Sequence, residues 1–144
     1  MRREKETIEK ALGQKIITCR QHWLRFSFSQ TWEAQAKAGL KNDMTLGFND
    51  RPGFRNAAAV SMIDKYSGMK IIPMVLMDSH LYDYTNLSEE KREEMMAGIL
   101  RELLETGGEA SIIWHHRVFH SDYNWGAGYH RLLQKMSKMG FETV

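Results

Sequence analysis

The stretch that decides the fold is IIPMVLM (residues 71–77), which runs directly into Asp78-Ser79-His80. An apolar run that ends in polar side chains is typical of a buried parallel strand, and in α/β folds the chemistry lies at the carboxyl ends of such strands. The same pattern recurs twice. Residues 16–19 run into the polar and aromatic cluster Arg20 to Phe26, and residues 110–114 run into His115-His116-Arg117.

Helical patterns separate the predicted strands. The clearest helix begins after Ser88, a good N-cap, and ends at Gly107-Gly108, with an apolar face between Met95 and Leu104. Other helices are expected over residues 3–12, from a Ser29 cap to Ala38, and over residues 125–139. Strands are expected over residues 16–20, 43–48, 71–77 and around Ile112, with a weak strand or loop over residues 57–62.

This alternation favours an α/β fold with four or five mostly parallel strands, because parallel neighbours need a crossover that a helix supplies. A closed (β/α) barrel needs about eight strands and roughly 250 residues. We therefore expect either an open sheet or part of a barrel, in one domain spanning residues 1–144.

Composition excludes several classes of protein. The chain has 42% hydrophobic and 26% charged residues, as ordinary globular domains do, and Lys+Arg 20 against Asp+Glu 18 without a basic run does not suit nucleic acid. No apolar run approaches the roughly 20 residues of a membrane span, and the charged N-terminus carries no export signal, so we expect no membrane partner and a cytoplasmic protein. The single cysteine, Cys19, is expected to be a buried inert thiol.

Three residues are candidates for catalysis. His115 follows an apolar strand and suits proton transfer or metal binding, although it could instead hydrogen-bond a loop carbonyl. Arg20 could orient a carboxylate, and Asp78 could act as a base or ligand; the alternatives are a solvated surface Arg and a helix N-cap or loop Asp.

Other residues are candidates for binding. Arg25 could hold an anionic group of a ligand, and Trp23 and Trp114 would suit a sugar-binding cleft unless they are ordinary core residues. The histidines at positions 22, 80, 115 and 120 form at best a weak zinc set, because no tight ligand spacing enforces its geometry. We therefore expect no metal to be bound by this chain.

The motifs RQHWLRF (20–26), AGLKNDMTLGFNDRPGFRN (38–56), PMVLMDSHLYDY (73–84) and IIWHH (112–116) occur in this order. Together they resemble the C-terminal half of a polysaccharide deacetylase (NodB-homology) domain, in a bacterial branch, over nearly the whole chain. The run TLGFNDRPGFRN is the most specific part, because nothing in strand or helix periodicity asks for it.

The resemblance implies a partial, distorted (β/α) barrel and a hydrolase acting on carbon–nitrogen bonds, which removes N-acetyl groups from amino sugars with a divalent, zinc-like metal. It implies that His115 is the general acid, that Arg20 supports a catalytic Asp, and that Asp78 belongs to a late aspartate motif. Trp23, Arg25, Arg55, Trp114 and His22 would then contact the carbohydrate ligand.

The resemblance also places the family's Asp-Asp and His-x-x-x-His metal motifs ahead of residue 1. We therefore expect the chain to be inactive unless a missing N-terminal half completes it. That half, the N-terminal helix or a homodimer mate would cover the exposed edge of the first strand, since soluble proteins avoid bare sheet edges. The alternative is a non-catalytic carbohydrate-binding or protein-interaction module.

Overall fold

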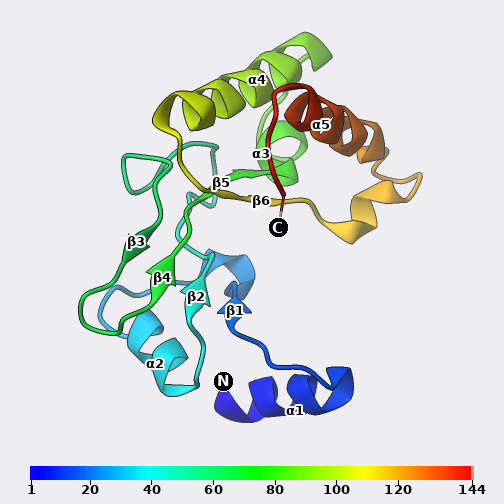
Figure 1. Ribbon diagram of the computed structural model, residues 1–144. Helices are drawn as coiled ribbons and strands as arrows, with labels where there is room; N and C mark the ends of the chain where they lie inside the picture. Colours follow the sequence, from blue (N-terminus) through cyan, green and yellow to red (C-terminus); the bar gives the residue numbers. More distant parts are fainter. Residues whose placement is uncertain (144) are drawn as a thin grey trace.

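Strand β5 (Met74–Met77) lies at the centre of the protein, and all four of its residues are buried. The computed structural model describes residues 1–143. Over these residues the chain is a mixed α/β protein with five α-helices and two small, mostly parallel sheets, and the strands close into no barrel (Figure 1). The α/β class is therefore confirmed.

The remaining elements follow in chain order. They are α1 (Arg2–Leu12), β1 (Thr18–Cys19), α2 (Thr31–Lys37), β2 (Asn42–Asp43), β3 (Met62–Ile63), β4 (Lys70–Ile71), α3 (Asp78–Tyr82), α4 (Glu89–Thr106), β6 (Ser111–Ile113) and α5 (Gly126–Lys138). Short 3-10 turns cover His22–Leu24 and His116–Phe119.

The two sheets have separate hydrogen-bond ladders, but one extended stretch of chain, which contains β4 and β5, belongs to both. One sheet has the order β1-β2-β4-β3, with only β3 antiparallel, and the other is the parallel pair β5-β6. The predicted strand over residues 71–77 is present but divided at Pro73, which has no N–H for a ladder. Hydrogen bonds from Ile72 N to Asp43 O (2.9 Å) and from Met74 N to Leu46 O (2.9 Å) hold the segment that contains β2 beside both halves.

Strand β2 ends earlier than the predicted range of residues 43–48. Thr45 turns its backbone N–H (3.0 Å) and its hydroxyl (2.6 Å) onto the side chain of Asp43. Gly47 then passes so close to Met74 that an added Cβ would lie 2.5 Å from its Cε. Only a residue without a side chain permits this approach.

The helices confirm most of the predicted boundaries. Ser88 accepts a hydrogen bond from Lys91 N at the start of α4, and Gly107 ends the helix with a φ of 61°. Ser29 is not a cap: Gln30 holds that position without a capping side-chain bond, and the Ser29 hydroxyl lies 3.1 Å from that of Ser27. Helix α3 was not predicted, because its five residues are too few for a periodic pattern.

The buried side chains gather on both faces of the strands. The larger cluster lies under α4 and α5 and includes Val75, Leu76, Met96, Leu100 and Leu132. A second cluster lies between α2 and the first sheet, around Trp32, Leu46 and Ile71. No helix among residues 1–143 is long and apolar enough to cross a membrane.

Asp43 is the polar centre of the second cluster. It is fully buried, and its carboxylate accepts hydrogen bonds from Trp32 Nε1 (3.3 Å), Gln35 Nε2 (2.6 Å) and both polar groups of Thr45. The Cys19 thiol lies 3.9 Å from it. Burial, together with the Asp43 charge, raises the pKa of Cys19 to about 12, which agrees with an inert thiol.

Replacing Asp43 with Ala should lower the free energy of unfolding by about 3 kcal/mol or more, because several buried donors lose their acceptor at once. Urea unfolding followed by circular dichroism measures the change. Asp122→Ala is the matched control, since that carboxylate is exposed and should leave the midpoint unchanged. Equal midpoints for the two variants would contradict the structural role of Asp43.

Candidate functional site

Asp78 and His115 form a directly bonded pair at the carboxyl ends of β5 and β6. The Asp78 side chain is fully buried, whereas that of His115 is 34% exposed. His115 Nδ1 lies 2.7 Å from Asp78 Oδ1, and the His115 backbone N–H donates to Asp78 Oδ2 at 2.8 Å. The Ser79 N–H also donates to Oδ1 at 2.8 Å. The structure thus brings together two of the three residues predicted to be catalytic.

These contacts define what the pair can do. A carboxylate only accepts hydrogen bonds, so the short contact places a proton on His115 Nδ1. Nε2 is then the nitrogen left to exchange a proton with a ligand, since the carboxylate orients the ring. An imidazole that is partly exposed and held in this way is suited to general acid–base chemistry.

His80 lies two residues after Asp78 in α3 and is fully buried. Its Nδ1 accepts a hydrogen bond from Met77 N (3.1 Å), and its Nε2 lies 3.2 Å from the carbonyl oxygen of Phe48. Burial lowers the pKa of His80 because the charged imidazolium is disfavoured away from water. His80 therefore links the loop after β2 to the end of β5 through both of its ring nitrogens.

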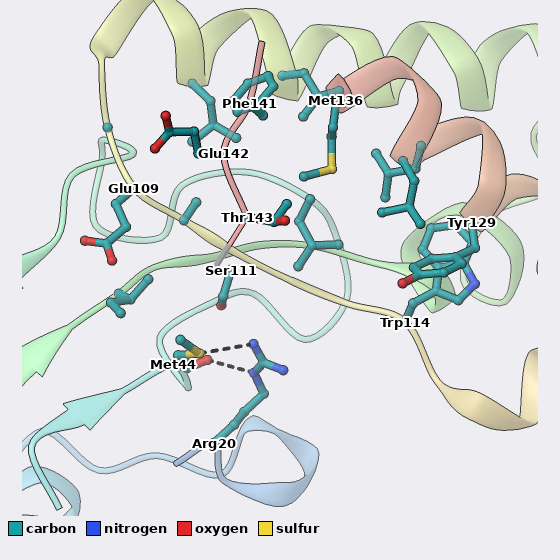
Figure 2. A pocket seen from close by; sticks show the side chains of 18 of the residues that line it. Arg20, Met44, Glu109, Ser111, Trp114, Tyr129, Met136, Phe141, Glu142 and Thr143 are labelled. Atoms are coloured by element: carbon teal, nitrogen blue, oxygen red, sulfur yellow. Dashed lines mark hydrogen bonds between the residues drawn. The ribbon is translucent and has the colours of Figure 1, made fainter. Parts of the chain in front are cut away.

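Arg20 does not contact the pair. Its Nε donates to the carbonyl oxygen of Met44 at 3.1 Å, and its Nη2 lies 3.8 Å from the Met44 sulfur. Cys19 faces Asp43, and Arg20, as the next residue in an extended segment, points to the side away from Asp43. Its guanidinium lies beside Met44 (Figure 2). Among residues 1–143 it forms no ion pair with a carboxylate.

The turn His22–Leu24 approaches the pair through Leu24. Leu24 is buried against Met77 and Ile113, which immediately precede the segments carrying Asp78 and His115. Trp23 is 70% exposed and has a φ of 60°, and Leu24 has a φ of 48°. Two successive non-glycine residues in this left-handed region are uncommon and cost energy. This backbone presents the Trp23 ring, with His22 at its edge 6.0 Å away, to solvent.

The other residues predicted to bind substrate lie apart. Arg25 is exposed, and Arg55 donates to the Gly47 carbonyl oxygen at 3.1 Å. Trp114 is half-buried between Tyr82 (6.1 Å between ring centroids) and Tyr129 (5.7 Å). These contacts give Trp114 a packing role alongside any role in binding.

The residues described do not suit a metal ion. Among residues 1–143 no group of three or more His, Cys, Asp or Glu side chains converges. A His-x-x-x-His spacing does occur at His116 and His120, but it lies after β6 on a 3-10 turn, and His120 Nδ1 lies 3.2 Å from Asp122 Oδ2. With three residues per turn, the 3-10 turn does not align positions four apart on one face.

No protein-family model, curated protein or solved structure matches the chain.

The Asp78 contact predicts that neutral His115 carries its proton on Nδ1. Long-range ¹H–¹⁵N correlation spectra of the imidazole should show this tautomer, and Asp78→Asn should diminish it, because an amide cannot accept all three hydrogen bonds that the carboxylate accepts. His130, which is exposed, is the internal control and should not change. An Nε2–H tautomer in the native protein would contradict the geometry.

The lowered pKa of His80 predicts an acid-sensitive fold. A histidine in the unfolded chain has a pKa of about 6.5. Below that pH the unfolded chain therefore binds a proton at this residue, whereas the folded chain leaves His80 neutral until its lower pKa is reached. Stability should be intact above about pH 6.5 and fall as the pH drops toward the lower folded pKa, by at most about 1.4 kcal/mol per pH unit for this group.

Urea midpoints at pH 7.5 and 5.5 measure this dependence. His80→Asn keeps an acceptor for Met77 N and should reduce the difference between the two midpoints, whereas His130→Gln should preserve it. A native difference that persists in His80→Asn would assign the acid sensitivity to other groups.

Proposed function

We propose that this chain provides the acid–base part of a polysaccharide deacetylase-type hydrolase, which removes N-acetyl groups from amino sugars. The observation that carries the proposal is the Asp78–His115 pair. Both residues lie where the sequence resemblance expects functional residues, and they interact directly although 37 positions separate them.

In this proposal His115 is the general acid. Cleaving an amide requires a proton for the departing nitrogen, and a positioned histidine supplies such a proton. When His115 is protonated, Asp78 holds Nδ1–H and stabilises the imidazolium, while Nε2–H faces away from the carboxylate toward the substrate. Asp78 is thus a positioning residue for His115.

The exposed turn His22–Leu24 would contact the sugar. The flat face of Trp23 is available for packing against a pyranose ring, and Leu24 anchors the turn beside β5 and β6. Arg25 and Arg55, both exposed, would contact polar groups further along the carbohydrate.

The metal that the family resemblance implies has no ligand set among the described residues, so we derive no step through it. The proposal therefore includes a second polypeptide half that carries the Asp-Asp and His-x-x-x-His motifs. Without that half the chain is expected to release no acetate.

The second candidate is a non-catalytic carbohydrate-binding module. The observation that favours it is Trp23, whose ring is 70% exposed at the end of a strained turn. Such a module would bind acetylated oligosaccharides without needing His115.

Acetate release from N-acetylated chitooligosaccharides distinguishes the two candidates. With Zn²⁺ alone the chain should give none. Co-expression with a family N-terminal half should restore release, and His115→Ala should lower that rate by about 100-fold or more, the usual contribution of general acid–base catalysis.

His130→Ala, an exposed histidine on α5, is the matched control and should leave the restored rate unchanged. Restored release that is insensitive to His115→Ala would exclude the catalytic assignment. Saturable binding by calorimetry, lost in Trp23→Ala and without release in either sample, would favour the binding module.

A further inference from the structure

A pocket of about 790 Å³ lies along β6 (Figure 2). Helices α4 and α5 and the segment 141–143 form its walls, and Arg20 and Met44, which directly follow β1 and β2, lie at its other end. Ser111, Ile112 and Trp114 all line it. Because successive strand residues point to opposite faces, the pocket follows the edge of β6 and reaches around both of its faces.

The backbone of β6 is unpaired along this edge. Among residues 1–143, β6 pairs with β5 alone. The N–H groups of Ser111 and His115 point toward β5, donating to Pro73 O (2.7 Å) and Asp78 Oδ2 (2.8 Å). By alternation, the N–H groups of Ile112 and Trp114 point into the pocket.

Polar side chains in the pocket also lack partners. Ser111 is 8% exposed, and its hydroxyl has no hydrogen bond within the described part of the chain; the same is true of Trp114 Nε1. Buried polar atoms are normally hydrogen-bonded, so these two unpartnered atoms mark a stretch of the pocket wall whose polar groups the described chain does not satisfy.

The positive charge of Arg20 at one end of the pocket has no ion-pair partner among residues 1–143. The Arg20 guanidinium lines the cavity near Ser111, and its hydrogen bonds within residues 1–143 go to the carbonyl oxygen and sulfur of Met44 (Figure 2). Of the two pocket carboxylates, Glu109 is already paired with Lys70 at 2.5 Å, and Glu142 lies on the terminal segment at the opposite end. An incoming carboxylate would complement Arg20.

We propose that this pocket is a docking site for an extended polypeptide segment, which adds to β6 as a further strand and places a carboxylate against Arg20. The free N–H groups favour a peptide over a small molecule, because strand addition derives its affinity from main-chain hydrogen bonds. The apolar wall, which includes Trp114, Leu132 and Met136, would hold alternate side chains. This inference does not depend on deacetylation.

Selection from a displayed library of random nine-residue peptides on the full chain tests the proposal. Enriched peptides should alternate apolar residues and carry Asp or Glu at one fixed position. Arg20→Glu should exchange that acidic preference for Lys or Arg. Arg101→Glu, which reverses an exposed charge on α4 outside the pocket, should select the same peptides as the native chain.

The mode of binding is tested with the most enriched peptide. Amide hydrogen exchange at Ile112 and Trp114 should slow at least tenfold when the peptide binds. Two versions of the peptide should be compared, one N-methylated at its odd-numbered residues and the other at its even-numbered residues. One version should lose binding and the other should keep it, because only one of these two sets of N–H groups faces β6.

Three results would overturn the proposal. The first is the absence of enrichment, or an acidic preference unchanged in Arg20→Glu. The second is binding of decanoate, a simple apolar carboxylate, that competes with the peptide while Ile112 and Trp114 exchange as before. The third is protection of these amides that rises with protein concentration alone, which would identify a second copy of the chain as the occupant.

Discussion

The buried carboxylate of Asp78 is the constraint on which the rest of the site depends. A carboxylate removed from water is tolerated only when its oxygens are hydrogen-bonded. Here the donors are the Ser79 N–H and two groups of His115, so satisfying this one charge joins the end of β5 to the segment after β6. The orientation of the His115 ring follows from the same requirement. Stability and the arrangement of a candidate catalytic group therefore have a single physical origin.

The run TLGFNDRPGFRN serves to enclose β5. Leu46 O accepts from Met74 N, Gly53 N donates to Val75 O at 2.9 Å, and the Phe48 carbonyl oxygen contacts His80. Gly47 permits the close approach to Met74. These tasks explain why the run follows neither strand nor helix periodicity: its residues are selected by contacts with another segment. Within this structure, the most specific part of the sequence resemblance therefore packs against β5, whereas the candidate catalytic groups are those of Asp78 and His115.

Sequence patterns correctly predicted the helices and strands that depend on residues close together in the chain. Ser88 and Gly107 bound α4, and the apolar run after residue 70 forms a buried strand, as expected from sequence. The Asp43 network could not be predicted, because its donors Trp32 and Gln35 become neighbours only when α2 packs on the sheet. The contacts of the Arg20 to Phe26 cluster could not be predicted for the same reason. Its composition indicates a functional role, but alternation along the chain directs Arg20 away from Asp43 and into a pocket, where it hydrogen-bonds Met44 and does not contact the Asp78–His115 pair.

The two sides of β6 give its residues different hydrogen-bonding surroundings. On one side, Asp78 fixes the His115 N–H and ring. On the other side, the Trp114 N–H, one peptide unit away, faces the open pocket. A strand edge without a neighbour is less constrained than a paired strand, since its backbone groups are left to water. Any group that pairs with this edge would therefore also restrict the peptide that carries His115, so the geometry of the Asp78–His115 pair and the occupancy of the pocket are physically coupled.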